Sequence, residues 1–213
     1  MRTRSRALAL VLFDEVELLD VAAPLQALTL AGRQWNFRPF KVFAVAAQPG
    51  TIQTRNQLAL EAPVPLADCP SPELLLVPGG YGARRALADD GLVAWLEAAG
   101  ASAELVLGVG NGVLLLGAAG LLDGRETAIP KSAAAQLAEV APLALPRPGA
   151  GVVDAGKVLT AGTSIAALDL GLLVIARTLG AKMALGVAAE LGHTPGITLG
   201  APEPPKVEIK DVR

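Results

Sequence analysis

The chain has 213 residues, of which 52% are hydrophobic and 18% charged, and its formal net charge is −2. This composition is too apolar for a disordered chain, and the charge provides no long-range attraction to nucleic acid or to an anionic membrane, so neither is expected as a partner. The chain has one cysteine and one histidine, which excludes an internal disulfide and an ordinary closed zinc site; we expect no metal, no cofactor and a reducing, cytoplasmic location.

Strand-like apolar runs alternate with helix-like stretches along the chain. Strands are predicted over residues 7–13, 40–46, 73–77, 104–109 and 157–160. Helices are predicted over residues 24–31, 83–99, 113–122, 132–140 and 166–179. This order predicts right-handed βαβ crossovers and a doubly wound, mostly parallel sheet with helices on both faces, whose ligands bind beyond the carboxyl ends of the strands.

Three other segments need a separate interpretation. Residues 51–66 have alternating apolar positions and predict a small β excursion, whereas residues 141–151 are rich in proline and glycine and predict a surface loop. Residues 105–122 carry no charge over eighteen positions, which reaches the lower length limit of a membrane span. Five glycines and Asn111 interrupt that stretch, so it predicts a buried strand, a turn and a buried helix. No linker or repeat divides the chain, and we expect one domain over residues 1–213.

Candidate site residues lie after three of the predicted strands. Asp20 follows the first and is interpreted either as a helix cap or as a pocket acid. Gly79-Gly80 follows the third strand and can offer backbone N–H groups to an anion or oxyanion, although Pro-Gly-Gly is also an ordinary turn. Gly110-Asn111-Gly112 connects the fourth strand to a helix, and a sharp turn of this kind can hold a nucleophile beside an oxyanion hole or form an anion site.

Four segments resemble successive signatures of the ThiJ/PfpI superfamily: VLFDEVELLDVAAP, ELLLVPGGYG, VLLLGAAGLLDGRETA, and GKVLTAG followed by ALDLGLLVIARTLG. The resemblance covers roughly residues 7–190 in the right order and spacing. It is greatest to the branch that contains isonitrile hydratase and the amidotransferase-like domains of AraC-type regulators. The resemblance implies a flavodoxin-like domain, a homodimer, and an active site with a cysteine at the strand-to-helix turn beside an acidic residue of the first helix.

The resemblance also places these site residues on the present sequence. It identifies the acidic residue with Asp20, locates the oxyanion-hole glycine in Gly79-Gly80, and puts the position of the cysteine at Gly110. Many relatives read Val-Cys-Thr-Gly at this turn, where this chain reads Val109-Gly110-Asn111-Gly112. Glycine has no side chain and cannot form a covalent adduct, although it tolerates a strained turn.

Two further departures affect the same site. Relatives often have a histidine where this chain has Ile129, and their Thr-Ser-Ala-Gly motif is altered to Thr160-Ala161-Gly162-Thr163, which leaves Thr163 as a binding candidate. Cys69 precedes a strand and so lies at the wrong end of the sheet for a displaced nucleophile. His193 is interpreted as a surface group near the C-terminus and not as part of a serine-based triad.

Three functions are consistent with these features. The preferred one is a catalytically silent relative that binds a small polar molecule, with Gly79, Gly80, Asn111, Gly112 and Thr163 as binding residues, or that acts through its dimer surface. The second is a non-covalent hydratase or hydrolase of the isonitrile or aldehyde hydration type, in which Asp20 directs a water onto a substrate polarised by backbone N–H groups. The third is a ligand-sensing module that acts through a partner, because the terminal PEPPKVEIKDVR contains no helix-turn-helix.

Overall fold

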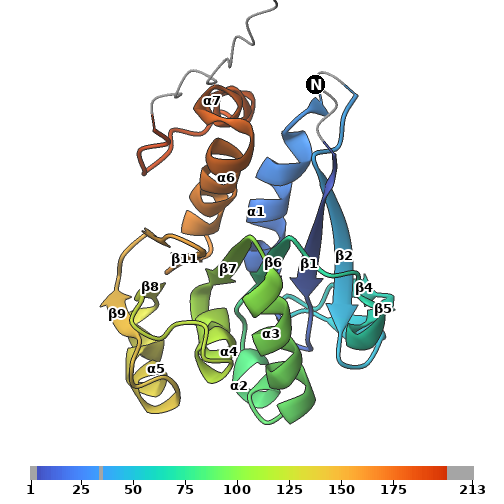
Figure 1. Cartoon of the computed structure of the whole chain (residues 1–213), viewed down its shortest axis with the longest axis vertical. Coiled ribbons are helices and arrows are strands. Elements are labelled where there is room, and N and C mark those ends of the chain that lie inside the picture. Colours follow the sequence, from blue (N-terminus) through green and yellow to red (C-terminus); the bar gives the residue numbers. More distant parts are fainter. Residues whose placement is uncertain (1–3, 34–35, 201–213) are drawn as a thin grey trace, which may run out of the picture.

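The computed structural model describes residues 4–33 and 36–200, which form an α/β fold with a central sheet between two layers of helices (Figure 1). The terminal PEPPKVEIKDVR lies outside these residues. The central strands are β1 (Arg6–Val11), β2 (Phe40–Ala46), β5 (Val64–Pro65), β6 (Leu74–Val77), β7 (Leu105–Val109), β10 (Val152–Ala155) and β11 (Val158–Ala161). In the described chain their order is β10-β11-β7-β6-β1-β2-β5, and only β10 runs antiparallel to its neighbour. The predicted fold class is therefore confirmed.

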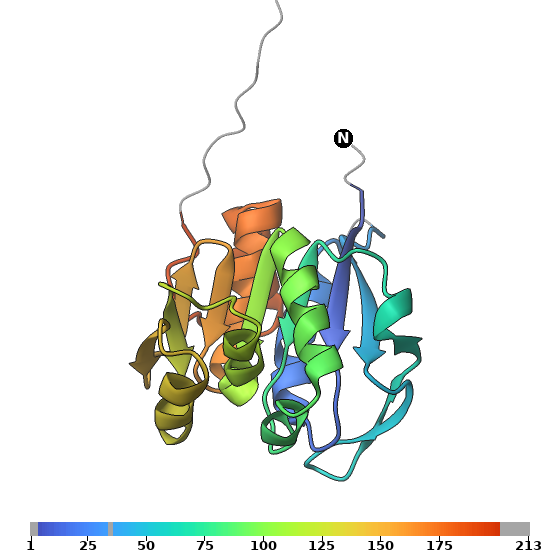
Figure 2. The same ribbon diagram turned by 60° about the horizontal axis from the view of Figure 1, so that its bottom comes forward.

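Helices cover both faces of this sheet (Figure 2). They are α1 (Leu18–Leu30), α2 (Ala83–Ala86), α3 (Asp90–Ser102), α4 (Val113–Ala118), α5 (Ala134–Val140), α6 (Ala166–Leu179) and α7 (Ala181–Glu190). Side chains of one strand alternate between the faces, so Leu8 and Leu10 belong to the core under α1 and α6, whereas Ala9 and Val11 belong to the core under α3 and α4. Burial on both faces explains why the central strands are continuous apolar runs.

The structure differs from the sequence prediction at several elements. The predicted helix 83–99 is two helices, because the Asp89 carboxylate accepts a hydrogen bond from the Leu92 N–H at 2.9 Å and caps a new helix. The first helix begins at Leu18, so Pro24 lies inside it and not in its first turn. The predicted loop 141–151 contains a strand, since β9 (Leu145–Pro148) pairs with β8 (Glu126–Ile129). The predicted β excursion is the hairpin of β3 (Gly50–Gln53) and β4 (Ala59–Ala62).

The uncharged stretch 105–122 folds as predicted. It forms β7, a short turn over Gly110–Gly112 and α4. Within residues 4–33 and 36–200, none of the helices combines the length and the apolar character that a membrane crossing requires.

Candidate functional site

The carboxyl ends of four parallel strands bring most of the candidate residues together. Asp20 lies in the first turn of α1, which follows β1, while Gly80, Gly110 and Thr163 follow β6, β7 and β11. Together with Asn111, these residues line a cavity of about 250 Å³. Gly79 borders it through a hydrogen bond to Asp20, and Gly112 packs below it against the backbone of Pro78.

Gly110 occupies the turn between β7 and α4 in the left-handed region, with φ at +56°. Only glycine adopts this region without steric cost, so a glycine at position 110 suits the turn. A Cβ at position 110 would lie 2.8 Å from Asp20 Oδ2. A side chain at residue 110 would therefore point at the buried acid, and Asp20 would have to shift to admit its Cβ.

Asp20 is almost completely buried, with 2% of its surface exposed. Its Oδ2 accepts a hydrogen bond from the Gly79 N–H at 3.0 Å, and its Oδ1 has no hydrogen-bond partner among the described residues. Burial raises the pKa of the Asp20 carboxyl, while the nearby Ser164 hydroxyl and the Gly79 N–H oppose the rise and Glu17 adds to it. The N-cap position of α1 belongs to Glu17, so the interpretation of Asp20 as a helix cap is wrong.

We expect Asp20→Asn to raise the free energy of unfolding at neutral pH by roughly 0.5–2 kcal/mol. Because the pKa of Asp20 is raised from 3.8 in the folded state, the folded protein loses stability as pH rises from about that value through the higher folded value. Asparagine avoids this loss and its side-chain oxygen can still accept from Gly79. The stability gain should therefore shrink as pH falls toward 3.8.

Urea unfolding at several pH values tests this prediction, with the exposed Asp123→Asn as the matched control that should change little. A lower stability of Asp20→Asn at neutral pH would mean that the ionised carboxylate is favoured by its neighbours more than burial disfavours it.

The backbone N–H groups of Gly79 and Gly80 are already used within the protein. The Gly79 N–H donates to Asp20, and the Gly80 N–H donates to Asn111 Oδ1 at 2.8 Å. Asn111 also donates from Nδ2 to the Gly80 carbonyl at 2.9 Å. The expectation that Gly79 and Gly80 offer free donors to an oxyanion is therefore wrong, because two side chains distant in sequence satisfy both N–H groups.

The cavity includes residues that the sequence reasoning missed: Glu17, Arg55, Tyr81, Arg84, Pro130, Ser132, Gly162 and Ser164. The Arg55 guanidinium lies over the Tyr81 ring, 4.8 Å from its centre. Tyr81 and Arg84 come directly after the Pro-Gly-Gly turn of β6, so their place at the ligand-binding edge of the sheet was a usable signal. No comparable signal pointed to Arg55, because Arg55 reaches the edge from the β3–β4 hairpin.

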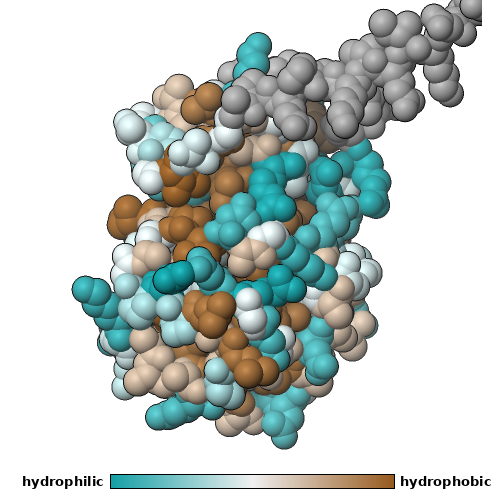
Figure 3. All heavy atoms as spheres, turned by 60° about the vertical axis from the view of Figure 1, so that its left-hand side comes forward, coloured by the Kyte–Doolittle hydropathy of each residue, from teal (hydrophilic) through white to brown (hydrophobic). Residues whose placement is uncertain are grey.

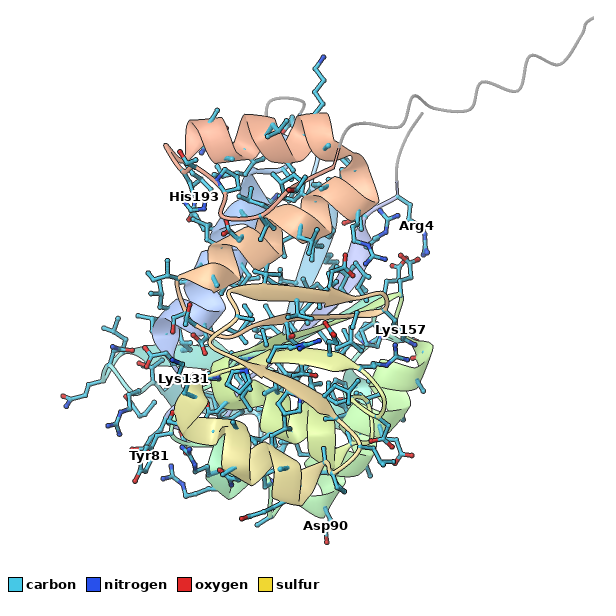
Figure 4. The ribbon with its side chains drawn as sticks, turned by 90° about the vertical axis from the view of Figure 1, so that its left-hand side faces the viewer. Arg4, Tyr81, Asp90, Lys131, Lys157 and His193 are labelled. Atoms are coloured by element: carbon cyan, nitrogen blue, oxygen red, sulfur yellow. The ribbon has the colours of Figure 1, made fainter. Side chains whose placement is uncertain are left out.

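Other residues considered from the sequence lie elsewhere. Cys69 is partly exposed before β6, where burial raises its pKa, and it does not line the cavity. His193 is not a free surface group, since its Nε2 lies 2.6 Å from Asp169 Oδ1. Figure 4 shows His193 beside α7, apart from Tyr81. Ile129 and Thr160 are fully buried.

Two larger hollows, of about 810 and 390 Å³, lie at the C-terminal half of α1 and include none of the candidate residues. In the part of the chain that the structure describes, there is no group of three or more histidine, cysteine, aspartate or glutamate residues that could hold a metal ion.

Comparisons with known proteins agree with the fold. The model of the DJ-1/PfpI family matches residues 6–177. An isonitrile hydratase from Pseudomonas putida is 28% identical over 190 residues, which cover 87% of this chain and 77% of that enzyme. The crystal structure of a ThiJ/PfpI family protein from Pseudomonas syringae matches with a TM-score of 0.81 at 25% identity, over 95% of this chain and 78% of that one. That of an AraC family transcriptional regulator from Pseudomonas putida matches with a TM-score of 0.72 at 24% identity, over 87% and 99%.

Proposed function

This chain belongs to the DJ-1/PfpI family, and we propose that it is a member without covalent catalysis that binds a small polar molecule in the cavity beside Asp20. One observation carries the proposal: residue 110 faces the buried acid, with its Cβ position 2.8 Å from Asp20 Oδ2, but as glycine it has no side chain. Without a thiolate or hydroxyl at this point no covalent intermediate forms there. The cavity of about 250 Å³ and the unpartnered Asp20 Oδ1 suit a bound ligand.

The second candidate is non-covalent hydration; the Pseudomonas putida relative is named as a hydratase of isonitriles. The buried carboxyl of Asp20 favours it, because burial raises the pKa of this acid and so moves its titration toward neutral pH. The Gly80 N–H argues against it, since its bond to Asn111 removes a donor that would stabilise developing negative charge. Binding without turnover is therefore the better-supported function.

The proposal includes a homodimer in the cytoplasm, and two exposed hydrophobic residues support the dimer. Leu19 and Ile165 are 41% and 71% exposed, and each is next in sequence to a residue that lines the cavity. Figure 3 shows further hydrophobic surface among hydrophilic residues on the side of the molecule that carries β9 and α6.

We expect no catalysed conversion of a simple isonitrile such as benzyl isonitrile to its formamide. Proton NMR of the formyl group measures the product, and the rates with the protein, with Asp20→Asn and with buffer alone should be equal. A rate with the unchanged protein at least about tenfold above buffer and lost in Asp20→Asn would replace the binding proposal with hydration, since a positioned acid or base contributes about 10²–10⁴-fold.

A further inference from the structure

Two arginines stand at the cavity without a carboxylate partner. Arg84 donates its Nε to Gln136 Oε1 at 2.9 Å, and the Arg55 guanidinium lies over Tyr81. Among the described residues neither arginine takes part in an ion pair. The neighbouring Arg85, in contrast, is 2.6 Å from Glu15 and lies outside the cavity lining. The two cavity arginines therefore keep donors for an external anion.

The contact with the Tyr81 ring restricts the positions that the Arg55 guanidinium can adopt. A guanidinium over an aromatic face is held by electrostatic attraction and loses less freedom when it binds an anion. Two planar guanidinium groups recognise carboxylates with paired N–H donors. The two cavity arginines are thus suited to a carboxylate.

Two carboxyl groups also line the cavity. Glu17 and Asp20 line it, and the unpartnered Oδ1 of Asp20 is buried. A buried carboxylate oxygen without a partner is costly, and a hydrogen-bond donor on a ligand would satisfy it. The Asp20 carboxyl is therefore suited to a hydroxyl or N–H group.

We propose that the ligand is a small carboxylate that also carries a hydroxyl or N–H group: Arg55 and Arg84 hold the carboxylate, and the donor reaches Asp20. This inference rests on the proposed binding function and names its ligand class. The volume of about 250 Å³ favours a small ligand, because it lies below the range of about 300–1,000 Å³ usual for drug-sized ligands.

Two matched pairs of compounds test the proposal: glycolate with glycolamide, and N-formylglycine with N-formylglycinamide. Within a pair only the carboxylate changes, to a neutral amide of nearly the same size. Calorimetry or ligand-observed NMR at low salt should give at least about tenfold tighter binding of the acid, and added NaCl should reduce the difference. Arg84→Gln and Arg55→Gln should each weaken the acid about tenfold and leave the amide unchanged. Arg85→Gln is the matched control, and it should bind like the parent.

Each other outcome has a distinct meaning. Equal affinity for acid and amide, unchanged by either arginine substitution, would overturn the carboxylate assignment and leave the binding function in place. The same loss in Arg85→Gln as in Arg84→Gln would also overturn it, because the effect would then follow net charge and not the site. Failure of all four compounds to bind at millimolar concentration would count against both this inference and the proposed binding function.

Discussion

Gly110→Cys, made in a Cys69→Ser background, is expected to react with iodoacetamide faster than an unperturbed thiol of pKa about 8.5. The Cβ of residue 110 would lie 2.8 Å from Asp20 Oδ2, so the new thiol would sit beside a buried carboxyl whose pKa is raised. A carboxyl that keeps its proton to higher pH can donate to the thiolate and favour it over the thiol. Stopped-flow alkylation against pH measures the apparent pKa of this pair.

The reactivity of the thiol at position 110 should depend on Asp20. In the Gly110→Cys background, Asp20→Asn should shift the apparent thiol pKa by about one unit, upward where the carboxyl donates to the thiolate and downward where it is ionised and repels it. Cys69→Ser alone should match the parent in stability, since the partly exposed Cys69 contacts only the Pro70 carbonyl as a hydrogen-bond partner. A thiol pKa near about 8.5 that does not respond to Asp20 would mean that residue 110 and Asp20 do not face each other in solution.

The same variant carries a structural cost. A non-glycine residue at φ +56° is strained, and the 2.8 Å approach forces Asp20 to shift. We expect Gly110→Cys to lower the free energy of unfolding by about 1–3 kcal/mol relative to Cys69→Ser alone, as measured by urea unfolding. The alkylation rates should therefore be measured under conditions in which both Gly110→Cys variants, with and without Asp20→Asn, remain folded.

Much of the fold follows from the sequence because its strands are buried on both faces. Runs such as Leu74–Val77 and Leu105–Val109 have no polar alternation, and helical stretches separate them, which is typical of parallel sheets. Small strands escaped prediction for the opposite reason. The strand β9 (Leu145–Pro148) is exposed along its whole length and has two prolines, so its pattern resembles a loop.

Only the placement of the candidate residues at one edge of the sheet could be predicted, because it follows from the topology. The rule that ligands bind at the carboxyl ends of parallel strands places Asp20, Gly80 and Gly110 at one edge. Hydrogen bonds between residues far apart in sequence could not be predicted, and the bond from Gly80 to Asn111 changed the chemistry expected of that edge. The position of Arg55 depends on how the β3–β4 hairpin folds over the sheet, which no local pattern encodes.

Gly112→Ala is expected to destabilise the protein by about 3 kcal/mol, the upper part of the usual range for overpacking. Gly112 has an ordinary φ of −59°, so conformational freedom is not the reason for a glycine here. A Cβ at this position would lie 2.3 Å from the Pro78 carbonyl oxygen and 2.6 Å from the Val77 carbonyl oxygen. Both atoms belong to the backbone at the end of β6, which is held between β1 and β7 and cannot move aside cheaply.

Gly186→Ala in α7 is the matched control, because a Cβ there would meet no atom within 4 Å. An alanine in place of an exposed helical glycine should stabilise the protein by roughly 0.5–1 kcal/mol, so the two glycine-to-alanine changes should have opposite signs in urea unfolding. Equal and small effects would show that the turn after β7 does not pack against Pro78. Such a result would also remove the basis for the site, because the same close packing sets residue 110 against Asp20.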